Sequence, residues 1–593
     1  MRRRIAGPRA APRLARAALH CAAAGAIGVT TTANAAAPTT APTATTTATT
    51  TATTTAVPSP GQTPAEPQAQ SQKKPPFATR CTDLGGLWLD AEVIALPTYG
   101  AHVETATLIS AQTPGNGAGE FCRITGVIRA LKGTTPDIRF DLNLPRRWNG
   151  RALQVGGGGY NGTVVTGIGV MPFSPVRAPL AQGYVTFGDD SGHVGNSALA
   201  VFGLVDEAVV NFGYAHLKKT HDAALALIVR MYGHPPDRMY FAGGSTGGRE
   251  GYTVMQRFPD DYDGVIADSP ALNFSGVRLI GVRIGQAEYA SPGGFVPPAL
   301  LERVYQKTLE VCDKLDGAAD GIVSDVAQCR QRESEIVDAL RCHRGTSYAH
   351  EGGCLTDTQL ATLLVLRDGL KLPYKLAYDV GGYAGYNVFQ GTRLNGMLGL
   401  GHDAARQAAP TFNGNGYLYA QGDGYIRYFV AQDATFDSMN FDVLHPGKYQ
   451  KQLVALSQTI GAMNPDLNRF IAKGGKLITM QGLADEVISP NQTIAYYDRL
   501  VDRYGEARVN AFMRLYMVPG FQHGGGVFIP SVDLLGALDG WVTRGVSPET
   551  LLSTDISPST NGRSRPLCRY PMFPRYLGRG NLNEANNFVC SEP

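Results

Sequence analysis

The chain has 593 residues, a formal net charge of +3 and a charged fraction of 17%, and this length suits one large domain with an insertion or two domains. Six arginines and no acidic residue lie before residue 36, so the rest of the chain is slightly acidic. We therefore expect no nucleic-acid partner, because such partners require a basic surface.

The first 35 residues are predicted to be a signal peptide. Arginines at 2–4 precede an alanine-rich apolar run over 17–29, and Ala-Asn-Ala at 33–35 fits a cleavage site; a disordered tail of a cytosolic protein is the alternative. Residues 36–75 are almost entirely Thr, Ala, Pro, Gln and Ser, which predicts a disordered linker. No later stretch is as long as a membrane span. We expect a secreted or periplasmic protein with no membrane partner, and the sequence leaves its oligomeric state open.

Residues 76–270 are predicted to form the first part of an α/β core. Apolar residues at helical spacing extend over 206–232. Runs typical of strands recur at 124–131, 138–142, 152–155, 184–187, 237–241 and 262–267. Strands that alternate with helices favour a parallel sheet with helical crossovers.

Four consecutive glycines at 156–159 follow the strand predicted at 152–155. Glycines expose backbone N–H groups and let a ligand approach closely. The Gly-Lys-Ser/Thr that would complete a phosphate loop is missing, whereas α/β-hydrolases take a backbone oxyanion donor from an early loop of this kind. A flexible connector is the alternative.

The segment 241–250 reads Phe-Ala-Gly-Gly-Ser-Thr-Gly-Gly-Arg-Glu and lies between a predicted strand and a helix predicted at 251–258. A Gly-x-Ser-x-Gly in this setting is the nucleophile elbow of α/β-hydrolases, with Ser245 as the nucleophile. A side chain at 243 or 247 would collide with the neighbouring strand and helix. The N-terminus of the helix would stabilise a developing oxyanion.

Two further residues with catalytic chemistry follow predicted strands near the C-terminus. Asp485 comes after the strand at 474–480, and His523 after the strand at 514–518; open α/β sheets place their sites at this edge. Ser245, Asp485 and His523 occur in the chain order of α/β-hydrolase triads. In such a triad His523 is the general base and Asp485 fixes its tautomer.

Residues 271–445 interrupt this pattern and are predicted to form an inserted lid domain, after which 446–593 completes the core. Inside the insertion, residues 313–322 read Asp-Lys-Leu-Asp-Gly-Ala-Ala-Asp-Gly-Ile. Three carboxylates in a glycine-containing turn offer the oxygens that Ca²⁺ prefers, although the spacing is not that of an EF-hand. A solvated acidic turn is equally consistent with these residues.

Eight cysteines remain after the predicted signal peptide. An even number in a secreted chain predicts disulfides, although eight cysteines allow 105 pairings. None has the Cys-x-x-Cys spacing of a zinc site. The sequence therefore predicts disulfides without fixing which cysteines are joined.

These motifs together resemble the tannase/feruloyl esterase family, which also contains mono(2-hydroxyethyl) terephthalate hydrolase. The resemblance rests on Gly-x-Ser-x-Gly-Gly-Arg-Glu at 243–250, on the acidic loop and on the late Gly-x-x-His, and it spans about residue 80 to the C-terminus. It implies an α/β-hydrolase fold with a lid and a serine carboxylic-ester hydrolase acting on aromatic-acid esters, feruloyl esters first. Gallate esters and terephthalate monoesters are the alternatives, and a catalytically silent binding module is the alternative from another class.

The resemblance also implies particular site residues. The oxyanion donors would be the backbone N–H groups of Thr246 and Gly159. A structural Ca²⁺ would be bound by the side chains of Asp313, Asp316 and Asp320 and the carbonyls of Ala318 and Ile322. Disulfides would join sequential cysteines, namely Cys81–Cys122, Cys312–Cys329, Cys342–Cys354 and Cys568–Cys590.

The chain departs from the family beside the nucleophile and the histidine. The family has a cysteine at each place, bridged beneath the triad, whereas this chain has Gly244 and Gly524. Both cysteines of the bridge are missing together, so we expect a variant of the family with an intact site rather than a damaged one.

Two arginines are candidates for binding a substrate carboxylate. Arg406 and Arg427 flank or lie in the aromatic-rich stretch 412–429, and an arginine binds a carboxylate in bidentate fashion. A surface arginine without such a role is the alternative for each.

Overall fold

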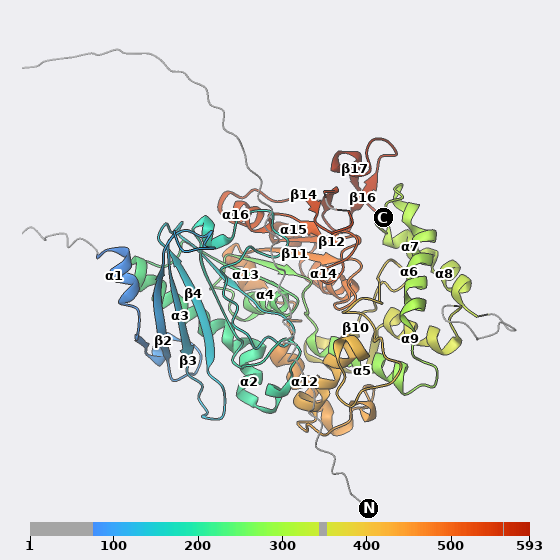
Figure 1. The fold of residues 1–593 in the computed structure, drawn as a ribbon, viewed down its shortest axis with the longest axis horizontal. Coiled ribbons are helices and arrows are strands. Elements are labelled where there is room, and N and C mark those ends of the chain that lie inside the picture. Colours follow the sequence, from blue (N-terminus) through green and yellow to red (C-terminus); the bar gives the residue numbers. More distant parts are fainter. Residues whose placement is uncertain (1–74, 343–352, 561) are drawn as a thin grey trace, which may run out of the picture. The chain divides into compact units, whose positions relative to one another are not determined.

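The computed structural model describes residues 75–342, 353–560 and 562–593; the predicted signal peptide and all but the last residue of the predicted linker lie outside them. A ten-stranded mixed sheet runs through the described chain (Figure 1), in the order β1-β2-β3-β4-β6-β5-β7-β8-β11-β12. Its antiparallel part consists of β1 (Trp88–Leu89), β2 (Ala101–Ile109), β3 (Phe121–Ile128) and β4 (Ile138–Pro145). The parallel part consists of β5 (Arg151–Val155), β6 (Val185–Asp189), β7 (Arg238–Gly244), β8 (Gly264–Asp268), β11 (Lys476–Gly482) and β12 (Met513–Val518).

The parallel strands are covered by helices on both faces. On β7, Phe241 belongs to the apolar core that includes α4 (Thr246–Arg257), whereas Tyr240 and Ala242 belong to the cluster that includes α16 (Leu534–Arg544). Successive side chains of a strand point to opposite faces, so these two clusters lie on opposite sides of the sheet. This is the predicted α/β-hydrolase fold, and every strand predicted from residue 124 onward forms to within a few residues.

The helix predicted at 206–232 forms, but it is not regular. It consists of α2 (Asp206–Val210), a π-helical segment η4 (Asn211–Ala215) and α3 (His216–Tyr232). The carbonyls of Phe212 and Gly213 accept hydrogen bonds from the Arg249 guanidinium at 3.1 and 2.6 Å. Such wide turns occur frequently at functional sites, and this one contacts the helix that begins directly after the predicted nucleophile.

The chain leaves the sheet after β8 and returns at β11. Figure 1 shows α5 to α9 beside the sheet. The intervening elements are α5 (Phe274–Tyr289), α6 (Pro298–Cys312), η5 (Asp313–Asp316), α7 (Val326–Gln331), α8 (Glu333–Leu340), α9 (Asp357–Asp368), β9 (Leu370–Leu376), η6 (Ala377–Asp379), β10 (Val380–Tyr383), α10 (Phe412–Asn415), α11 (Tyr417–Gly424), η7 (Tyr425–Val430), η8 (Ser438–Asn440), η9 (Gly447–Tyr449), α12 (Gln450–Ile460) and α13 (Asn468–Lys473). The chain from Pro75 to Pro593 is one compact unit, so the expected limits at 271 and 445 stay predictions.

The remaining elements lie at the two ends of the described chain and in the core connections. They are α1 (Phe77–Thr82), η1 (Ala91–Val93), η2 (Pro179–Gln182), η3 (Val201–Leu204), α14 (Pro490–Tyr504), α15 (Glu506–Phe512), β13 (Pro530–Ser531), β14 (Thr550–Asp555), β15 (Ser564–Cys568), β16 (Phe573–Tyr576), η10 (Ala585–Asn587) and β17 (Phe588–Ser591). Strands β13 to β15 form a small antiparallel sheet, and β16 pairs with β17.

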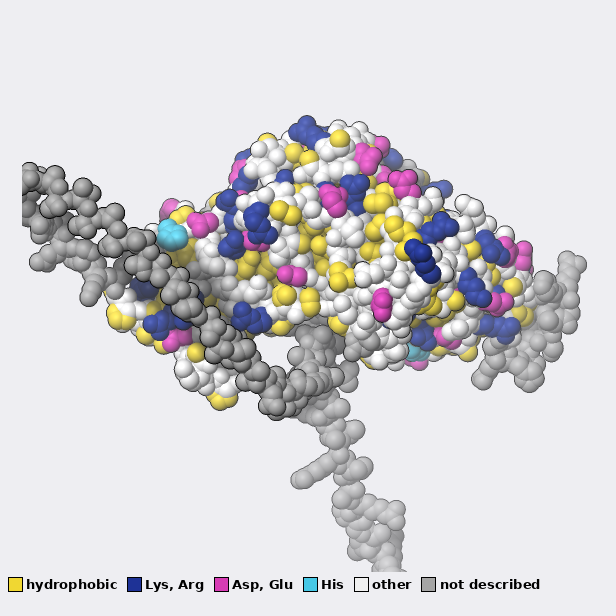
Figure 2. Space-filling view, turned by 90° about the horizontal axis from the view of Figure 1, so that it is seen from above, with side chains coloured by type: hydrophobic (Ala, Val, Ile, Leu, Met, Phe, Trp, Pro, Cys, Tyr) yellow, Lys and Arg dark blue, Asp and Glu magenta, His cyan; other side chains and the backbone are white. Residues whose placement is uncertain are grey.

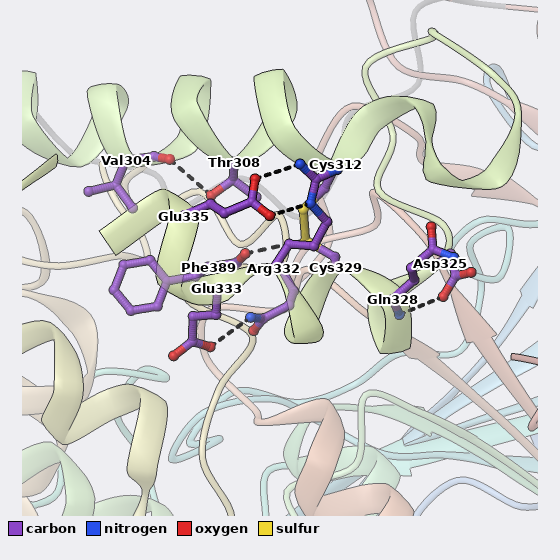
Figure 3. The surroundings of a disulfide bond; sticks show 11 residues. Val304, Thr308, Cys312, Asp325, Gln328, Cys329, Arg332, Glu333, Glu335 and Phe389 are labelled. Atoms are coloured by element: carbon purple, nitrogen blue, oxygen red, sulfur yellow. Dashed lines mark hydrogen bonds and ion pairs between the residues drawn. A yellow bond between two sulfur atoms is a disulfide. The ribbon is translucent and has the colours of Figure 1, made fainter. Parts of the chain in front are cut away.

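Four disulfides join the sequential cysteines, in the pairing that the family resemblance implies. Figure 3 shows one of them, in which Cys312 at the end of α6 is bridged to Cys329 on α7. Asp325 begins α7 by accepting a hydrogen bond from the backbone N–H of Gln328 at 2.8 Å. This bridge therefore closes the chain around the acidic loop at 313–322.

The surface is of mixed charge on the face seen in Figure 2, where basic and acidic side chains are interspersed among polar and apolar ones. Within the described ranges, no helix combines the length and the apolar character needed to cross a membrane.

Candidate active site

Ser245 lies in a sharp turn between β7 and α4. Its backbone has φ 58° and ψ −118°, a conformation that L-residues adopt only where the surrounding structure enforces it. A Cβ at Gly243 would lie 2.6 Å from the backbone of Gly247, and one at Gly247 would lie 2.7 Å from the carbonyl oxygen of Gly157. These two glycines are therefore required by close backbone contacts. Helix α4 begins at Thr246, five residues before the predicted start, so its first turn directly follows the serine.

The three residues of the predicted triad meet in one hydrogen-bonded chain. His523 Nε2 lies 3.0 Å from Ser245 Oγ, and His523 Nδ1 lies 2.9 Å from Asp485 Oδ2. Asp485 follows β11 and His523 follows β12, so both come from the carboxyl ends of parallel strands, at the same edge of the sheet as the end of β7. This is the geometry that a serine nucleophile, a general base and an orienting acid require.

Asp485 is fully buried, and both oxygens of its carboxylate accept hydrogen bonds. Oδ1 accepts from the backbone N–H groups of Val487 and Ile488, both at 2.8 Å. Oδ2 accepts from the Gln481 side chain at 2.9 Å as well as facing His523. A buried charge is tolerated only when it is satisfied in this way, so the position of the acid is tightly fixed. Sequence reasoning did not identify Gln481.

Two further carboxylates lie near His523. Glu486 accepts the backbone N–H of His523 at 3.1 Å, and Asp268 ends β8. Burial lowers the pKa of His523, but the charge and hydrogen bond of Asp485, with the charges of Glu486 and Asp268, outweigh it and raise this pKa to about 9. Burial raises the pKa of Glu486 and of Asp268 to about 7 each. Sequence reasoning missed both acids, although their positions at strand ends were a usable signal.

The glycine loop after β5 is joined to the first turn of α4. Thr246 Oγ1 donates to the carbonyl oxygen of Gly159 at 2.6 Å, and the N–H of Gly247 donates to the carbonyl oxygen of Gly157 at 2.7 Å. Gly159 has φ 59°, and a Cβ there would lie 2.4 Å from the carbonyl oxygen of Ser197. The hydrogen bonds of the described chain leave the N–H groups of Thr246 and Gly159 without an acceptor. Their assignment as oxyanion donors stays a prediction.

The two glycines that replace the family's cysteines have different surroundings. A Cβ at Gly244 would be in ordinary contact with Asp268, at 3.7 Å from its carboxylate, whereas Gly524 has φ 87° and would place a Cβ 4.0 Å from the Phe173 ring. A largely apolar cavity borders Gly244, between the elbow, the loop over 171–174 and α16. The Phe173 ring packs against Phe521, two residues before the histidine, with ring centroids 5.2 Å apart. Aromatic packing therefore supports the loop that carries His523, close to the position where the family's disulfide is missing.

The acidic loop is held by its own hydrogen bonds and by two arginines. Asp313 Oδ1 accepts the N–H groups of Asp320 and Gly321, and Asp316 Oδ1 accepts the N–H of Ala318. Arg565 binds the Asp320 carboxylate at 2.5 Å, and Arg563 donates to the Asp320 carbonyl oxygen at 2.9 Å.

The donor set of this loop fits Ca²⁺ in kind, since it consists of carboxylate and carbonyl oxygens. Asp316 is buried and its Oδ2 has no hydrogen-bond partner among the described residues; burial raises the pKa of this acid to about 6. On the other side, one oxygen of Asp320 is already bound by Arg565. In the part of the chain that the structure describes, no three acidic, histidine or cysteine side chains form a metal cluster by themselves. The calcium site therefore stays a prediction.

Both candidate substrate arginines are already bound to acids of the insertion. Arg406 contacts both oxygens of Asp437, at 2.5 and 3.1 Å, and Arg427 contacts Asp423 at 2.8 Å. A substrate carboxylate would have to displace an existing partner from either guanidinium. The structure thus offers no separate support for their predicted role in substrate binding.

Comparison with known proteins places the chain among esterases. The sequence profile described as "Tannase and feruloyl esterase" matches residues 122–591. An uncharacterized esterase of Agrobacterium fabrum is 40% identical over 518 residues, covering 86% of this chain and 93% of that protein. Mono(2-hydroxyethyl) terephthalate hydrolase of Piscinibacter sakaiensis is 31% identical over 553 residues, covering 86% and 90%. The crystal structure of feruloyl esterase B from Aspergillus oryzae has a TM-score of 0.70 at 26% identity, covering 87% of this chain and all of that one.

Proposed function

We propose a reaction mechanism and a substrate class for this chain, which belongs to the tannase and feruloyl esterase family and is a carboxylic-ester hydrolase. The proposed mechanism is acyl transfer through a Ser245–His523–Asp485 triad. One observation carries it: Ser245 Oγ, the His523 ring and the Asp485 carboxylate form an unbroken chain with contacts of 3.0 and 2.9 Å. A catalytically silent binding module would not require a serine in a strained backbone conformation to be aligned with a histidine and an acid.

In the first half of the reaction, Ser245 Oγ attacks the ester carbonyl carbon while His523 Nε2 takes the hydroxyl proton. Asp485 accepts the Nδ1–H hydrogen bond and balances the imidazolium that forms. The N–H groups of Thr246 and Gly159 would bind the oxyanion, and the positive end of α4 favours the same charge. When the tetrahedral intermediate collapses, the imidazolium returns its proton to the leaving alcohol and the acyl-enzyme remains.

In the second half, water replaces the alcohol. His523 takes a proton from the water as it attacks the acyl carbon, and then returns that proton to Ser245 Oγ as the acid leaves. The same two N–H groups serve both tetrahedral intermediates. No other group is needed to balance protons in this sequence.

The proposed substrates are small esters of aromatic acids. Support comes from the relatives named for feruloyl esterase and for mono(2-hydroxyethyl) terephthalate hydrolase. Feruloyl esters come first, and gallate esters and terephthalate monoesters are the alternatives. Rates of the purified enzyme on methyl ferulate, methyl gallate, mono(2-hydroxyethyl) terephthalate and an aliphatic ester of similar size would rank them. Faster turnover of the aliphatic ester would contradict the aromatic preference.

The triad is tested by covalent labelling. A fluorophosphonate should modify the wild-type protein at Ser245 and abolish its esterase activity, because it reacts with an activated serine. Ser245→Ala should be neither labelled nor active, while keeping the wild-type melting temperature. Labelling at another residue, or unimpaired turnover by Ser245→Ala, would overturn the proposed mechanism.

We further propose an extracytoplasmic location and a structural Ca²⁺. The four disulfides support the location, because disulfides persist in oxidising compartments. The unpartnered oxygen of buried Asp316 supports a cation in the acidic loop. Asp313, Asp316, Asp320 and the carbonyls of Ala318 and Ile322 would bind it. When bound, Ca²⁺ would neutralise the crowded carboxylates and stabilise the loop.

A further inference from the structure

Glu250 lies on the inner face of α4, five residues after Ser245, and it is fully buried. Its two carboxylate oxygens have different partners on the glycine loop. Oε2 accepts the backbone N–H of Gly157 at 3.1 Å, and Oε1 accepts the side-chain amide of Asn161 at 2.8 Å. These two partners lie two residues before and two residues after Gly159. One carboxylate therefore fixes both ends of the segment that carries the second oxyanion donor.

The contact is built into the backbone of the loop. A Cβ at Gly156 would lie 2.5 Å from Glu250 Oε2, and one at Gly157 would lie 2.6 Å from the Asn161 side chain. Glycine at both positions thus lets the loop close over the carboxylate. Because Thr246 and Gly247 also bond to the loop, three residues of one helix set its position relative to Ser245.

The charge of Glu250 is balanced inside the core. Arg249 Nη2 lies 3.4 Å and His216 Nε2 lies 3.6 Å from Oε1. His216 Nδ1 in turn lies 2.7 Å from Asp189. Burial lowers the pKa of His216, but the charge and hydrogen bond of Asp189, together with Glu250, raise it to about 9. The histidine is therefore a cation between two buried carboxylates at neutral pH.

The same groups form a closed ring of contacts around the loop. Asp189 also accepts the N–H of Ser191 at 2.8 Å, and the Ser191 hydroxyl accepts a hydrogen bond from the Asn161 amide. The ring therefore runs from Glu250 through Asn161, Ser191, Asp189 and His216 back to Glu250. It joins the end of β6, the start of α3, α4 and the glycine loop through hydrogen bonds and one ion pair, the 3.6 Å contact between His216 and Glu250.

We propose that Glu250 is a positioning residue for the oxyanion hole, which acts by holding Gly157 and Asn161 so that the Gly159 N–H stays aimed at the acyl oxygen. The inference rests on the proposed function, since it assigns a role within that site. It goes beyond the triad because Glu250 touches neither substrate nor nucleophile. A purely structural glutamate would stabilise the fold without affecting the transition state in particular.

The first test compares Glu250→Ala with Glu250→Gln. Alanine removes both anchoring bonds, so kcat should fall by about 100-fold, the cost of losing one oxyanion donor, while KM changes less than threefold. Glutamine can keep both bonds. Its oxygen can accept the N–H of Gly157, and its NH₂ can donate to the Asn161 side-chain oxygen if the Asn161 amide turns over. That oxygen has no partner among the described residues, so the rotation breaks no other bond of the oxygen. Glu250→Gln should therefore keep kcat within about fivefold, although its melting temperature falls because Arg249 loses its buried anion and His216 keeps only Asp189.

The second test measures the hole itself. Phenylboronic acid forms a tetrahedral adduct with an active serine and places an oxygen in the oxyanion hole. Its Ki should rise in Glu250→Ala by about the factor that kcat falls, whereas the Ki of the product acid should stay within threefold. A kcat within threefold of wild type, or a lower kcat with unchanged boronate affinity, would overturn the proposal.

Two more variants complete the design. Glu288→Ala is the matched control, because Glu288 is also buried, at 3% exposure, and its carboxylate has no partner among the described residues; its kcat and boronate Ki should match wild type. If Glu250→Ala does not fold, Asn161→Ala removes the bonds of Asn161 to Glu250 and Ser191 but leaves the Gly157 anchor, and it should lose about tenfold in kcat and boronate affinity together. An unchanged boronate Ki in Asn161→Ala would contradict the proposed positioning of the oxyanion hole by Glu250. A wild-type protein that neither hydrolyses esters nor reacts with fluorophosphonate would instead refute the proposed function.

Discussion

Replacing Asp485 by asparagine changes one atom and should invert the tautomer of His523. The oxygen of the new side chain is expected at the Oδ1 position, where Val487 and Ile488 donate two backbone N–H groups. The NH₂ group then occupies the Oδ2 position, 2.9 Å from His523 Nδ1, and the Gln481 amide must turn over to present its oxygen to this NH₂. An amide donor there requires a bare Nδ1, so the ring proton moves to Nε2. His523 then presents N–H to Ser245 and has no lone pair to accept its proton.

The expected loss follows from this inversion. A wrong tautomer in an otherwise intact triad lowers kcat by about 10⁴, which corresponds to about 5.5 kcal/mol at 1.36 kcal/mol per tenfold. The loss should appear in kcat with little change in KM, because Asp485 is fully buried and does not contact substrate.

The pH dependence gives an independent readout. In the wild type the pKa of His523 is raised to about 9, and only the neutral ring is a base. Activity should therefore rise with pH, with its inflexion near 9, and level off only above that pH. Asp485→Asn removes the main cause that raises this pKa, so the remaining activity should level off at a lower pH.

The assay is kcat on an aromatic ester from pH 5 to 10 for both proteins, with the melting temperature as a check on folding. A folded Asp485→Asn variant within tenfold of wild type, or one with an unmoved inflexion, would refute the reasoning.

Three further outcomes are expected. Removing Ca²⁺ with a chelator should lower the melting temperature by several degrees through mass action, and metal analysis without calcium would contradict the site at Asp316. In Gly244→Cys/Gly524→Cys the two cysteines should form a disulfide and raise the free energy of unfolding by about 1–2 kcal/mol. A disulfide usually contributes about 2–4 kcal/mol, and the strain of a positive φ at position 524 reduces this gain. Unpaired thiols in peptide mapping would contradict this prediction. Arg406→Gln should slow a terephthalate monoester and its neutral diester equally, because Asp437 already occupies the guanidinium; a loss on the monoester alone would restore the carboxylate role.

Much of the site could be predicted because its signals are local. The glycines around Ser245 are required by contacts within the turn and with the adjoining loop, so the motif itself carries the geometry. The parallel strands are buried on both faces and read as short apolar runs. Asp485 and His523 follow two of those runs, and the order of a known triad links them to the serine.

Other features depend on contacts between distant segments and had no such signal. Glu250 binds Gly157 and Asn161, which precede it by 93 and 89 residues in the sequence. Its position as the last residue of the elbow motif does not indicate these partners. The two candidate arginines flank or lie in an aromatic-rich stretch of the sequence, but their acidic partners become neighbours only in the folded insertion. The acids near His523 likewise come together only when β8 lies beside β11.

The π-helical segment η4 has a consequence for insertions and deletions. Each residue of a helix turns the chain by about 100°, and a wide turn holds one residue more than a regular one. Removing one residue from 211–215 would close the wide turn into a regular one and leave the rotation of α3 about its axis nearly unchanged, whereas a deletion inside α3 would rotate every later residue of that helix by about 100°. The deletion in η4 would instead displace the carbonyl oxygens of Phe212 and Gly213, which lie in η4 and accept hydrogen bonds from the Arg249 guanidinium. A one-residue deletion in η4 should therefore keep the contact between His216 and Asp189 while it weakens the binding of the Arg249 side chain, so the wide turn serves the first turns of α4 rather than the direction of α3.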